Sequence, residues 1–208
     1  KELARIFTEQ LNKNGGEVVE TASYADSDTD YKASLTSIAT KEFDVLFIAD
    51  YAKNAGLIIG QARSTAGLED VKIIGPDGFE DPQLNDLAGG AQNVNNVYFS
   101  THFSSLSDNQ KVADFVASYQ AFTKAAGKEE PASVFAALAY DAAYMLFAAI
   151  DAADSTDPEA IRDSLESLPA FSGVTGDISF DALHNAVKPA FLIELNNGAP
   201  VSATIVNP

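Results

Sequence analysis

A single carboxylate on a rigid turn is the group in this sequence with the clearest chemical potential. Residues 72–82 read KIIGPDGFEDP, so Asp77 follows a short apolar stretch within a Gly-Pro-Asp-Gly turn. A carboxylate there could hold a cation such as the ammonium group of a small solute, through a charge-assisted hydrogen bond that contributes about 1.5–3 kcal/mol. A plain structural interpretation is also open, because proline, aspartate and glycine are ordinary turn residues.

Two aromatic residues could line the same site. Tyr51 follows the apolar run DVLFIAD at 44–50, and it could supply a pocket wall with an apolar face and a hydroxyl, or merely cover the edge of a sheet. Phe135 lies in a long apolar segment together with Tyr140. Aromatic residues in such segments are more often part of a core than ligand contacts.

The sequence contains no recognisable set of catalytic groups. It has no cysteine, which excludes disulfides, thiolate chemistry and cysteine-based zinc sites. His102 and His184 lie far apart, and no nucleophile elbow or phosphate-binding glycine loop follows a strand. We therefore expect a protein that is not an enzyme and needs no cofactor or metal, with both histidines structural or at the surface.

The acidic segment DSDTD at 26–30 begins like a calcium-binding loop. Such a loop needs glycine at its sixth position and glutamate at its twelfth, where this sequence has Tyr31 and Ser37. We interpret the segment instead as the start of a helix, capped by Thr29 or Asp30.

Residues 1–103 alternate between helical and strand patterns, and these elements must position Asp77 and Tyr51. The expected helices are 1–13, 26–43, 53–68 and 82–90, and the expected strands are 17–24, 44–50, 71–75 and 96–103. Such alternation predicts βαβ units and a parallel sheet, in which ligands lie beyond the carboxyl ends of the strands. Both candidate residues follow strands, so we expect them at that edge.

The pattern changes after a polar loop near residue 104. Three helices are expected at 108–126, 132–153 and 157–168, followed by short strands at 176–180, 190–195 and 201–206. The sequence NNG at 196–198 predicts a hairpin turn between the last two strands. These patterns predict a boundary near residues 103–106.

Charge and hydropathy narrow the choice of partners. With 13 basic and 30 acidic residues the net charge is −17, which disfavours nucleic acid and anionic membrane surfaces as partners. The run SVFAALAYDAAYMLFAAI at 133–150 barely reaches the roughly 18–20 residues of a membrane span. Because Asp141 in its middle would be costly in lipid, we interpret this run as a buried helix of a soluble protein.

The order of these segments resembles the type I periplasmic binding proteins, specifically the branched-chain amino-acid (Leu/Ile/Val) binding family of ABC importers. The likeness covers essentially the whole chain. It is carried by the opening KELARIFTEQLNKNGGEVVETASYADSDTDYKASLTSI and by FDVLFIADY, GQAR, IIGPDGF, FVASYQAFT, FAALAYDAAYML, STDPEAIRDSL and GVTGDISFDALHNAVKPAFLIEL.

The resemblance implies an α/β fold of two lobes joined by crossing segments, with ligand bound between the lobes. Residues 1–103 would be the bulk of the second lobe, with its parallel βαβ sheet. Residues 104–187 would be helices and a strand of a partial first lobe, and 188–208 would return strands to the second lobe. We therefore expect a C-terminal fragment that lacks most of the first lobe.

The resemblance also assigns roles to the candidate residues. Asp77 falls where the family has an acidic residue that binds the ligand's α-ammonium group. Tyr51 falls at or beside an aromatic residue of the pocket wall, and Phe135 falls where a first-lobe aromatic residue can touch the ligand side chain. The groups that hold the ligand's carboxylate would belong to the missing part.

The function implied is that of a non-catalytic solute-binding protein, periplasmic or lipid-anchored at the cell surface, which delivers a small aliphatic amino acid to an ABC permease. A sensory or regulatory domain of the same fold, responding to an amide, urea or an amino acid, is the alternative. Because 136–150 is apolar on nearly every face, we also expect this fragment to expose apolar surface and to self-associate or domain-swap.

Overall fold

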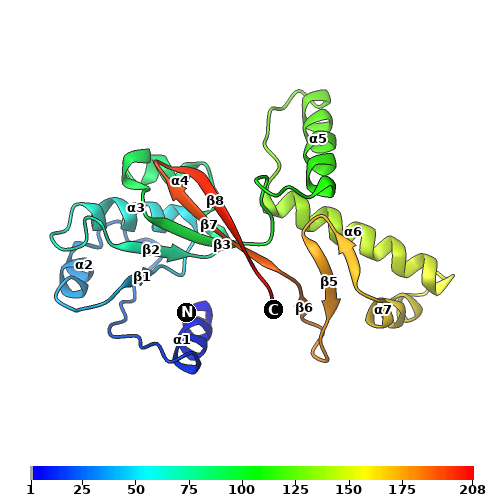
Figure 1. Cartoon of the computed structure of the whole chain (residues 1–208), viewed down its shortest axis with the longest axis horizontal. Helices are drawn as coiled ribbons and strands as arrows, with labels where there is room; N and C mark the ends of the chain where they lie inside the picture. Colours follow the sequence, from blue (N-terminus) through cyan, green and yellow to red (C-terminus); the bar gives the residue numbers. More distant parts are fainter. Residues whose placement is uncertain (1) are drawn as a thin grey trace. The chain divides into compact units, whose positions relative to one another are not determined.

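The structure is a computed structural model that describes residues 2–208, and it divides into two compact units (Figure 1). The first unit comprises the chain up to Ser100 together with Ile193–Ser202, and the second comprises Thr101–Leu192 with Ala203–Pro208. That they correspond to the two lobes implied by the resemblance, with boundaries at 103 and 187, stays a prediction.

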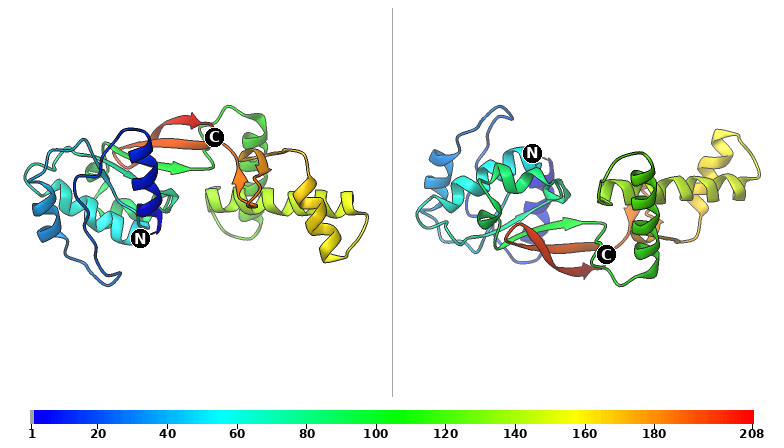
Figure 2. Two further views of the ribbon diagram at one scale, coloured as in Figure 1. Left: turned by 90° about the horizontal axis from the view of Figure 1, so that it is seen from below. Right: turned by 90° about the horizontal axis from the view of Figure 1, so that it is seen from above.

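A five-stranded sheet organises the first unit, in the order β1-β2-β3-β7-β8, although Thr101 of β3, Ala190–Leu192 of β7 and Ala203–Val206 of β8 are assigned to the second unit. β1 pairs with β2 and β2 with β3, both in parallel, which confirms the parallel arrangement expected for this part of the chain. Figure 2 shows β7 and β8 side by side next to β3. The strands are β1 Val45–Phe47, β2 Lys72–Gly75, β3 Val97–Thr101, β7 Ala190–Asn196 and β8 Ala199–Val206.

The hairpin expected between the last two strands is confirmed. Asn197 and Gly198 separate β7 from β8, and both have positive φ angles, of 49° and 70°. A two-residue loop with left-handed backbone at both positions matches the twist of the strands it joins.

Helix α3 carries the core of the first unit. The helices here are α1 Glu2–Lys13, α2 Lys32–Ile38, α3 Ala52–Arg63 and α4 Gln83–Leu87, with 3₁₀ turns η1 Asp77–Phe79 and η2 Ala91–Asn93. Gly56 and Gly60 let α3 approach α4 closely (Figure 1), since a Cβ atom on Gly56 would lie 2.6 Å from Leu87 Cβ. α3 also buries Ala55, Ile59 and Ala62 completely.

Two expectations for residues 17–43 were wrong. No strand forms at 17–24, because that segment has no neighbouring strand to complete a hydrogen-bonded ladder. The helix expected over 26–43 is limited to α2, and neither Thr29 nor Asp30 occupies its N-cap position, which is Tyr31. Asp30 Oδ1 accepts from Lys32 N at 3.0 Å just outside that position.

Three helices and a small antiparallel sheet form the second unit. The helices are α5 Gln110–Ala125, α6 Val134–Ala153 and α7 Pro158–Ser167, which confirm the expected ones to within a few residues. Their N-caps are Asn109, Ser133 and Asp157, each of which accepts a hydrogen bond from a backbone N–H of its helix. The sheet comprises β4 Phe171–Gly173, β5 Gly176–Phe180 and β6 Ala186–Val187, paired β4-β5-β6.

The expectation that α6 is a buried helix was only partly right. Its buried residues form one stripe, Val134, Ala137, Asp141, Met145 and Ala149, as the helical repeat requires. Large apolar side chains on its other faces are exposed. Within residues 2–208, α6 is the one helix with the length and composition of a membrane span, a combination that core helices of soluble proteins can share.

Candidate functional site

The segments that leave β1 and β2 emerge at the same edge of the sheet. These two strands are parallel neighbours, with Phe47 opposite Ile74, so their carboxyl ends lie side by side. Tyr51 follows β1 as the N-cap of α3, and Asp77 follows β2 at the start of η1. The structure thus brings these two predicted residues to one edge, where parallel sheets place their ligands.

The turn that carries Asp77 is held by packing beneath it. Phe79 is 2% exposed, and its ring lies directly over Gly75, where a Cβ atom would come within 2.1 Å of the Phe79 Cζ atom. The Phe79 amide donates to the Pro76 carbonyl at 3.1 Å and closes the turn. Asp77 itself is half-buried, and its carboxylate accepts no hydrogen bond from residues 2–208. The turn is therefore rigid and presents a carboxylate with free acceptor oxygens.

Tyr51 lies directly against this turn. A Cβ atom on Gly78 would be 2.8 Å from Tyr51 Cδ1, 3.1 Å from Tyr51 Cα and 3.2 Å from the Asp50 carbonyl oxygen. Only glycine allows the two turns to approach so closely, a requirement that sequence reasoning missed although the GPDG motif contains this glycine. The Tyr51 side chain is 72% exposed, so it is available as a wall for a bound solute.

Phe135, the third predicted residue, belongs to the other unit. It lies in the first turn of α6 and is 56% exposed, so it is not part of a core. Its contact with a ligand bound at Tyr51 and Asp77 stays a prediction.

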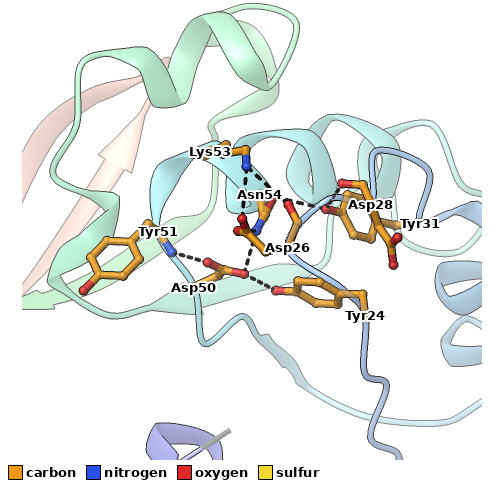
Figure 3. Close-up of polar contacts among 8 residues, drawn as sticks. All are labelled: Tyr24, Asp26, Asp28, Tyr31, Asp50, Tyr51, Lys53 and Asn54. Atoms are coloured by element: carbon orange, nitrogen blue, oxygen red, sulfur yellow. Dashed lines mark hydrogen bonds and ion pairs between the residues drawn. The ribbon is translucent and has the colours of Figure 1, made fainter.

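Sequence reasoning also missed Asp50, which immediately precedes Tyr51 (Figure 3). Asp50 Oδ1 accepts from the Tyr51 amide at 2.7 Å, and Oδ2 accepts from the Tyr24 hydroxyl at 2.8 Å and from Asn54 Nδ2 at 3.1 Å. An aspartate between the apolar strand and Tyr51 was visible in the sequence. Its partners were not, because Tyr24 is 26 residues away.

Asn54 links Asp50 to the acidic segment at 26–30. This asparagine is 2% exposed, and its Nδ2 also donates to Asp26 Oδ1 at 3.1 Å. Its Oδ1 accepts from the Tyr31 hydroxyl at 3.3 Å (Figure 3). Asp26 is further paired with Lys53, at 3.3 Å between Oδ2 and Nζ.

These contacts shift the titration of the groups that make them. Burial, followed by the hydrogen bond to Asp50, raises the pKa of Tyr24, and burial raises the pKa of Tyr31. Hydrogen bonds from Asn54 and Lys53 lower the pKa of Asp26. At neutral pH both tyrosines therefore act as hydroxyl donors and Asp26 as a charged acceptor.

Within residues 2–208 no group of three or more acidic, histidine or cysteine side chains is placed to hold a metal ion. In the DSDTD segment, Asp26 accepts from Asn54 and Lys53, and Asp28 Oδ2 accepts from the Ala25 amide at 2.8 Å. The histidines lie elsewhere. His102 Nδ1 is 3.1 Å from the Pro189 carbonyl oxygen, and His184 is exposed, 3.5 Å from Glu166.

Comparison with known proteins places the chain among solute-binding proteins. The sequence profile of the periplasmic binding protein family matches residues 1–200. The Leu/Ile/Val-binding protein BraC3 of Rhizobium johnstonii is 29% identical over 196 residues, which are 92% of this chain and 49% of that protein. A leucine-, isoleucine-, valine-, threonine- and alanine-binding protein of Pseudomonas aeruginosa is 26% identical over 154 residues, or 74% of this chain and 38% of that protein.

Solved structures agree with this likeness. LivJ of Streptococcus pneumoniae, a branched-chain amino-acid transporter substrate-binding protein crystallised with isoleucine, superposes with a TM-score of 0.85 at 33% identity and covers 100% of this chain and 57% of its own. The leucine-binding protein LivK of Thermotoga maritima gives a TM-score of 0.84 at 27% identity, covering 99% and 56%. The chain thus spans about half the length of the relatives it matches.

The likeness to Leu/Ile/Val-binding proteins and the α/β fold with a parallel-rich sheet, both expected from the sequence, are therefore confirmed. The family profile covers nearly the whole chain, and the fold agrees with solved structures above 25% identity. The chain belongs to the periplasmic binding protein family, whose members bind solutes and are not enzymes.

Proposed function

We propose that in the intact protein this chain forms half of a site for a small aliphatic amino acid of the branched-chain type, which the protein delivers to an ABC permease. The relative from Streptococcus pneumoniae is a transporter substrate-binding protein crystallised with isoleucine, and a curated relative is a Leu/Ile/Val-binding protein. These matches support transport over the sensory alternative. We propose an extracytoplasmic location, periplasmic or lipid-anchored at the cell surface.

The observation that carries the proposal is the half-buried Asp77 carboxylate on a turn that packs, through Gly78, against Tyr51 at the carboxyl edge of the sheet. A ligand ammonium group needs an anionic acceptor with free lone pairs, and Asp77 offers both oxygens. The Tyr51 ring, which lies against Gly78 of the same turn, can cover an aliphatic side chain. Phe135 from the other unit completes the proposed set, and the ligand's carboxylate would be held outside this chain.

Closure around the ligand is the proposed mechanism. Family members with ligand between two lobes exchange an open form for a closed form by hinge motion. Closure removes water from the site, which strengthens the interaction between Asp77 and the ammonium group.

Calorimetric titration of the intact protein with leucine, isoleucine and valine tests the role of Asp77. We expect Asp77→Asn to weaken binding by about 10- to 100-fold, because the charge-assisted hydrogen bond to the ammonium group is lost. Asp86→Asn is the matched control, since Asp86 is an exposed acid on α4 and its removal changes the net charge equally. Equal affinity of Asp77→Asn and wild type would contradict the ammonium assignment.

We further propose that the 208-residue chain by itself self-associates, by docking or domain swapping, through the exposed face of α6. Phe135, Tyr144, Leu146 and Phe147 are each between 43% and 56% exposed there. The acids of α6 are Asp141, which is buried, and Asp151 at its end, so the high net charge of the chain is not concentrated on this face.

Multi-angle light scattering tests this second proposal. We expect wild type to exceed the monomer mass and the double variant Leu146→Ser/Phe147→Ser to approach it. Leu183→Ser removes an exposed leucine elsewhere in the same unit, and should leave the mass unchanged. A wild-type monomer at high micromolar concentration would overturn the proposal.

A further inference from the structure

We propose that Asp50 is a positioning residue for the candidate ligand site, and that Tyr24 and Asn54 hold it in place so that Tyr51 presents its ring beside Asp77. The consequence for ligand binding rests on the proposed function, whereas the positioning of Tyr51 does not. The segment 24–31, which is far from Tyr51 in sequence, would then determine the orientation of the Tyr51 ring.

The Tyr51 backbone fixes where its ring can go. The side chain is 72% exposed and lies against Gly78, where a Cβ atom would be 2.8 Å from Tyr51 Cδ1. The Tyr51 carbonyl accepts from the Ala55 amide at 3.0 Å, and its amide donates to Asp50 Oδ1 at 2.7 Å. The first of these bonds belongs to the helix. The bond to the Asp50 carboxylate is therefore the one that fixes the backbone of Tyr51 where the chain enters α3.

The orientation of the Asp50 carboxylate depends in turn on donors outside the turn. A carboxylate that accepts only from the next amide can rotate away from it at little cost. Here the second oxygen, Oδ2, accepts from Tyr24 and from Asn54, on two different segments, so the plane of the carboxylate is fixed (Figure 3).

Asn54 is buried in the first turn of α3, which makes it a rigid support. Its amide nitrogen divides its two hydrogens between Asp50 and Asp26, while its oxygen accepts from Tyr31. The rings of Tyr24 and Tyr31 stack edge to face, with centroids 5.1 Å apart. The irregular segment between α1 and α2 is thereby attached to the edge of the sheet that carries Tyr51.

Asp50 and Asp77, the two acids discussed at this edge of the sheet, differ in how their charges are paired. The charge of Asp50 is taken up by three donors of the protein itself, whereas Asp77 accepts no hydrogen bond from residues 2–208. Asp50 therefore positions, and Asp77 is the acid left to meet a cation.

Fluorine NMR of the 208-residue chain labelled with 3-fluorotyrosine tests the positioning without any ligand. The Tyr51 resonance is assigned by its loss in Tyr51→Phe. We expect this resonance to shift or broaden in Tyr24→Phe and in Asp50→Ala, and to stay in place in Tyr98→Phe. Tyr98 is the control, because it lies on β3 and its hydroxyl is paired with Glu194, outside the contacts that hold Asp50.

Ligand affinity of the intact protein gives a second measurement. We expect Tyr24→Phe to weaken leucine binding by about two- to tenfold, the effect of losing one hydrogen bond. Asp50→Asn keeps an acceptor for the Tyr51 amide, so it should retain more affinity than Asp50→Ala. Should Asp50→Ala fail to fold, Tyr24→Phe still decides the question.

The two proposals fail in different ways. An unchanged Tyr51 resonance in Tyr24→Phe overturns the positioning role, even if leucine binds and Asp77→Asn abolishes that binding. If the Tyr51 resonance moves as expected but the intact protein binds no amino acid, the positioning role stands and the proposed function fails. A resonance that moves equally in Tyr98→Phe would also overturn the proposal, because the loss of any tyrosine hydroxyl would then have the same effect.

Discussion

Aspartates in the two units of this molecule are used in opposite ways. Asp141 on α6 is 2% exposed, and it accepts from the Val174 amide at 2.8 Å, the Thr175 amide at 2.8 Å and the Thr175 hydroxyl at 2.6 Å. Asp77, in the other unit, is half-buried and accepts no hydrogen bond from residues 2–208. The first is a structural anchor, and the second is a candidate for binding.

The surroundings of Asp141 show what a saturated carboxylate accomplishes. It fastens the turn between β4 and β5 to α6, and Gly173 leaves room for it, since a Cβ atom there would lie 2.5 Å from Asp141 Oδ2. Lys188 donates to the Thr175 hydroxyl oxygen, and burial lowers the pKa of Lys188. A buried charge is tolerated only when its partners are complete, so this arrangement favours one packing of the unit.

A carboxylate whose oxygens accept no hydrogen bond from the protein can bind a ligand, whereas one whose oxygens are saturated stabilises the fold. Its position near a strand or helix does not distinguish the two cases. Asp50 lies between the two extremes, because it is only half-buried but its charge is already taken up by neighbouring donors.

Removing the Asp141 carboxylate should have the largest effect on stability. In Asp141→Ala the buried amides of Val174 and Thr175 lose their acceptor, and we expect the free energy of unfolding to fall by about 2–5 kcal/mol. Asp77→Ala should change it by no more than about 0.5 kcal/mol, because that carboxylate accepts no hydrogen bond from residues 2–208. Urea denaturation followed by circular dichroism measures both, and similar losses in the two variants would refute the contrast.

Replacing Gly173 or Gly78 by alanine should also lower the free energy of unfolding, but by less than Asp141→Ala does. Gly173→Ala forces a methyl group against the buried Asp141 carboxylate, and we expect a loss of about 1–3 kcal/mol. Gly78→Ala meets the exposed Tyr51 ring at 2.8 Å, which can move, whereas the backbone atoms of Tyr51 and Asp50 lie farther away, at 3.1 and 3.2 Å, so it should cost less stability while weakening ligand binding in the intact protein. Thermal denaturation and calorimetry together check this, and a greater loss of stability in Gly78→Ala would count against it.

The smallest expected effect is on the unfolding free energy at alkaline pH, and it tests the hydrogen bond between Tyr24 and Asp50. Because burial and Asp50 raise the pKa of Tyr24 above its ordinary value of 10.0, the unfolded chain loses this proton at lower pH than the folded chain. The stabilisation is therefore complete below pH 10 and decreases as the pH rises above it. We expect Tyr24→Phe to flatten the decline of the unfolding free energy between pH 9.5 and 11, and an unchanged slope would show that Tyr24 titrates normally.

Much of the fold could be predicted from the sequence alone, because local patterns carry it. The apolar runs at 44–50 and 71–75 predicted β1 and β2, and the capping residues Asn109, Ser133 and Asp157 begin the helices of the second unit. The strand expected at 17–24 failed because a strand needs a neighbour, which no local pattern reveals.

The candidate site was only partly predictable for the same reason. Asp77 and Tyr51 stood out because each follows a strand, and strand ends are recognisable in the sequence. That Gly78 joins their two turns, and that Tyr24 and Asn54 hold Asp50, depends on contacts between segments far apart along the chain.

The sequence by itself therefore determined which residue types stand at the ends of the strands, since hydrophobic periodicity and turn residues are local properties. Only the tertiary structure decided which of the acids is free to bind. Whether a carboxylate has spare acceptor oxygens depends on which donors the fold brings to it, as the contrast between Asp77 and the saturated Asp141 shows.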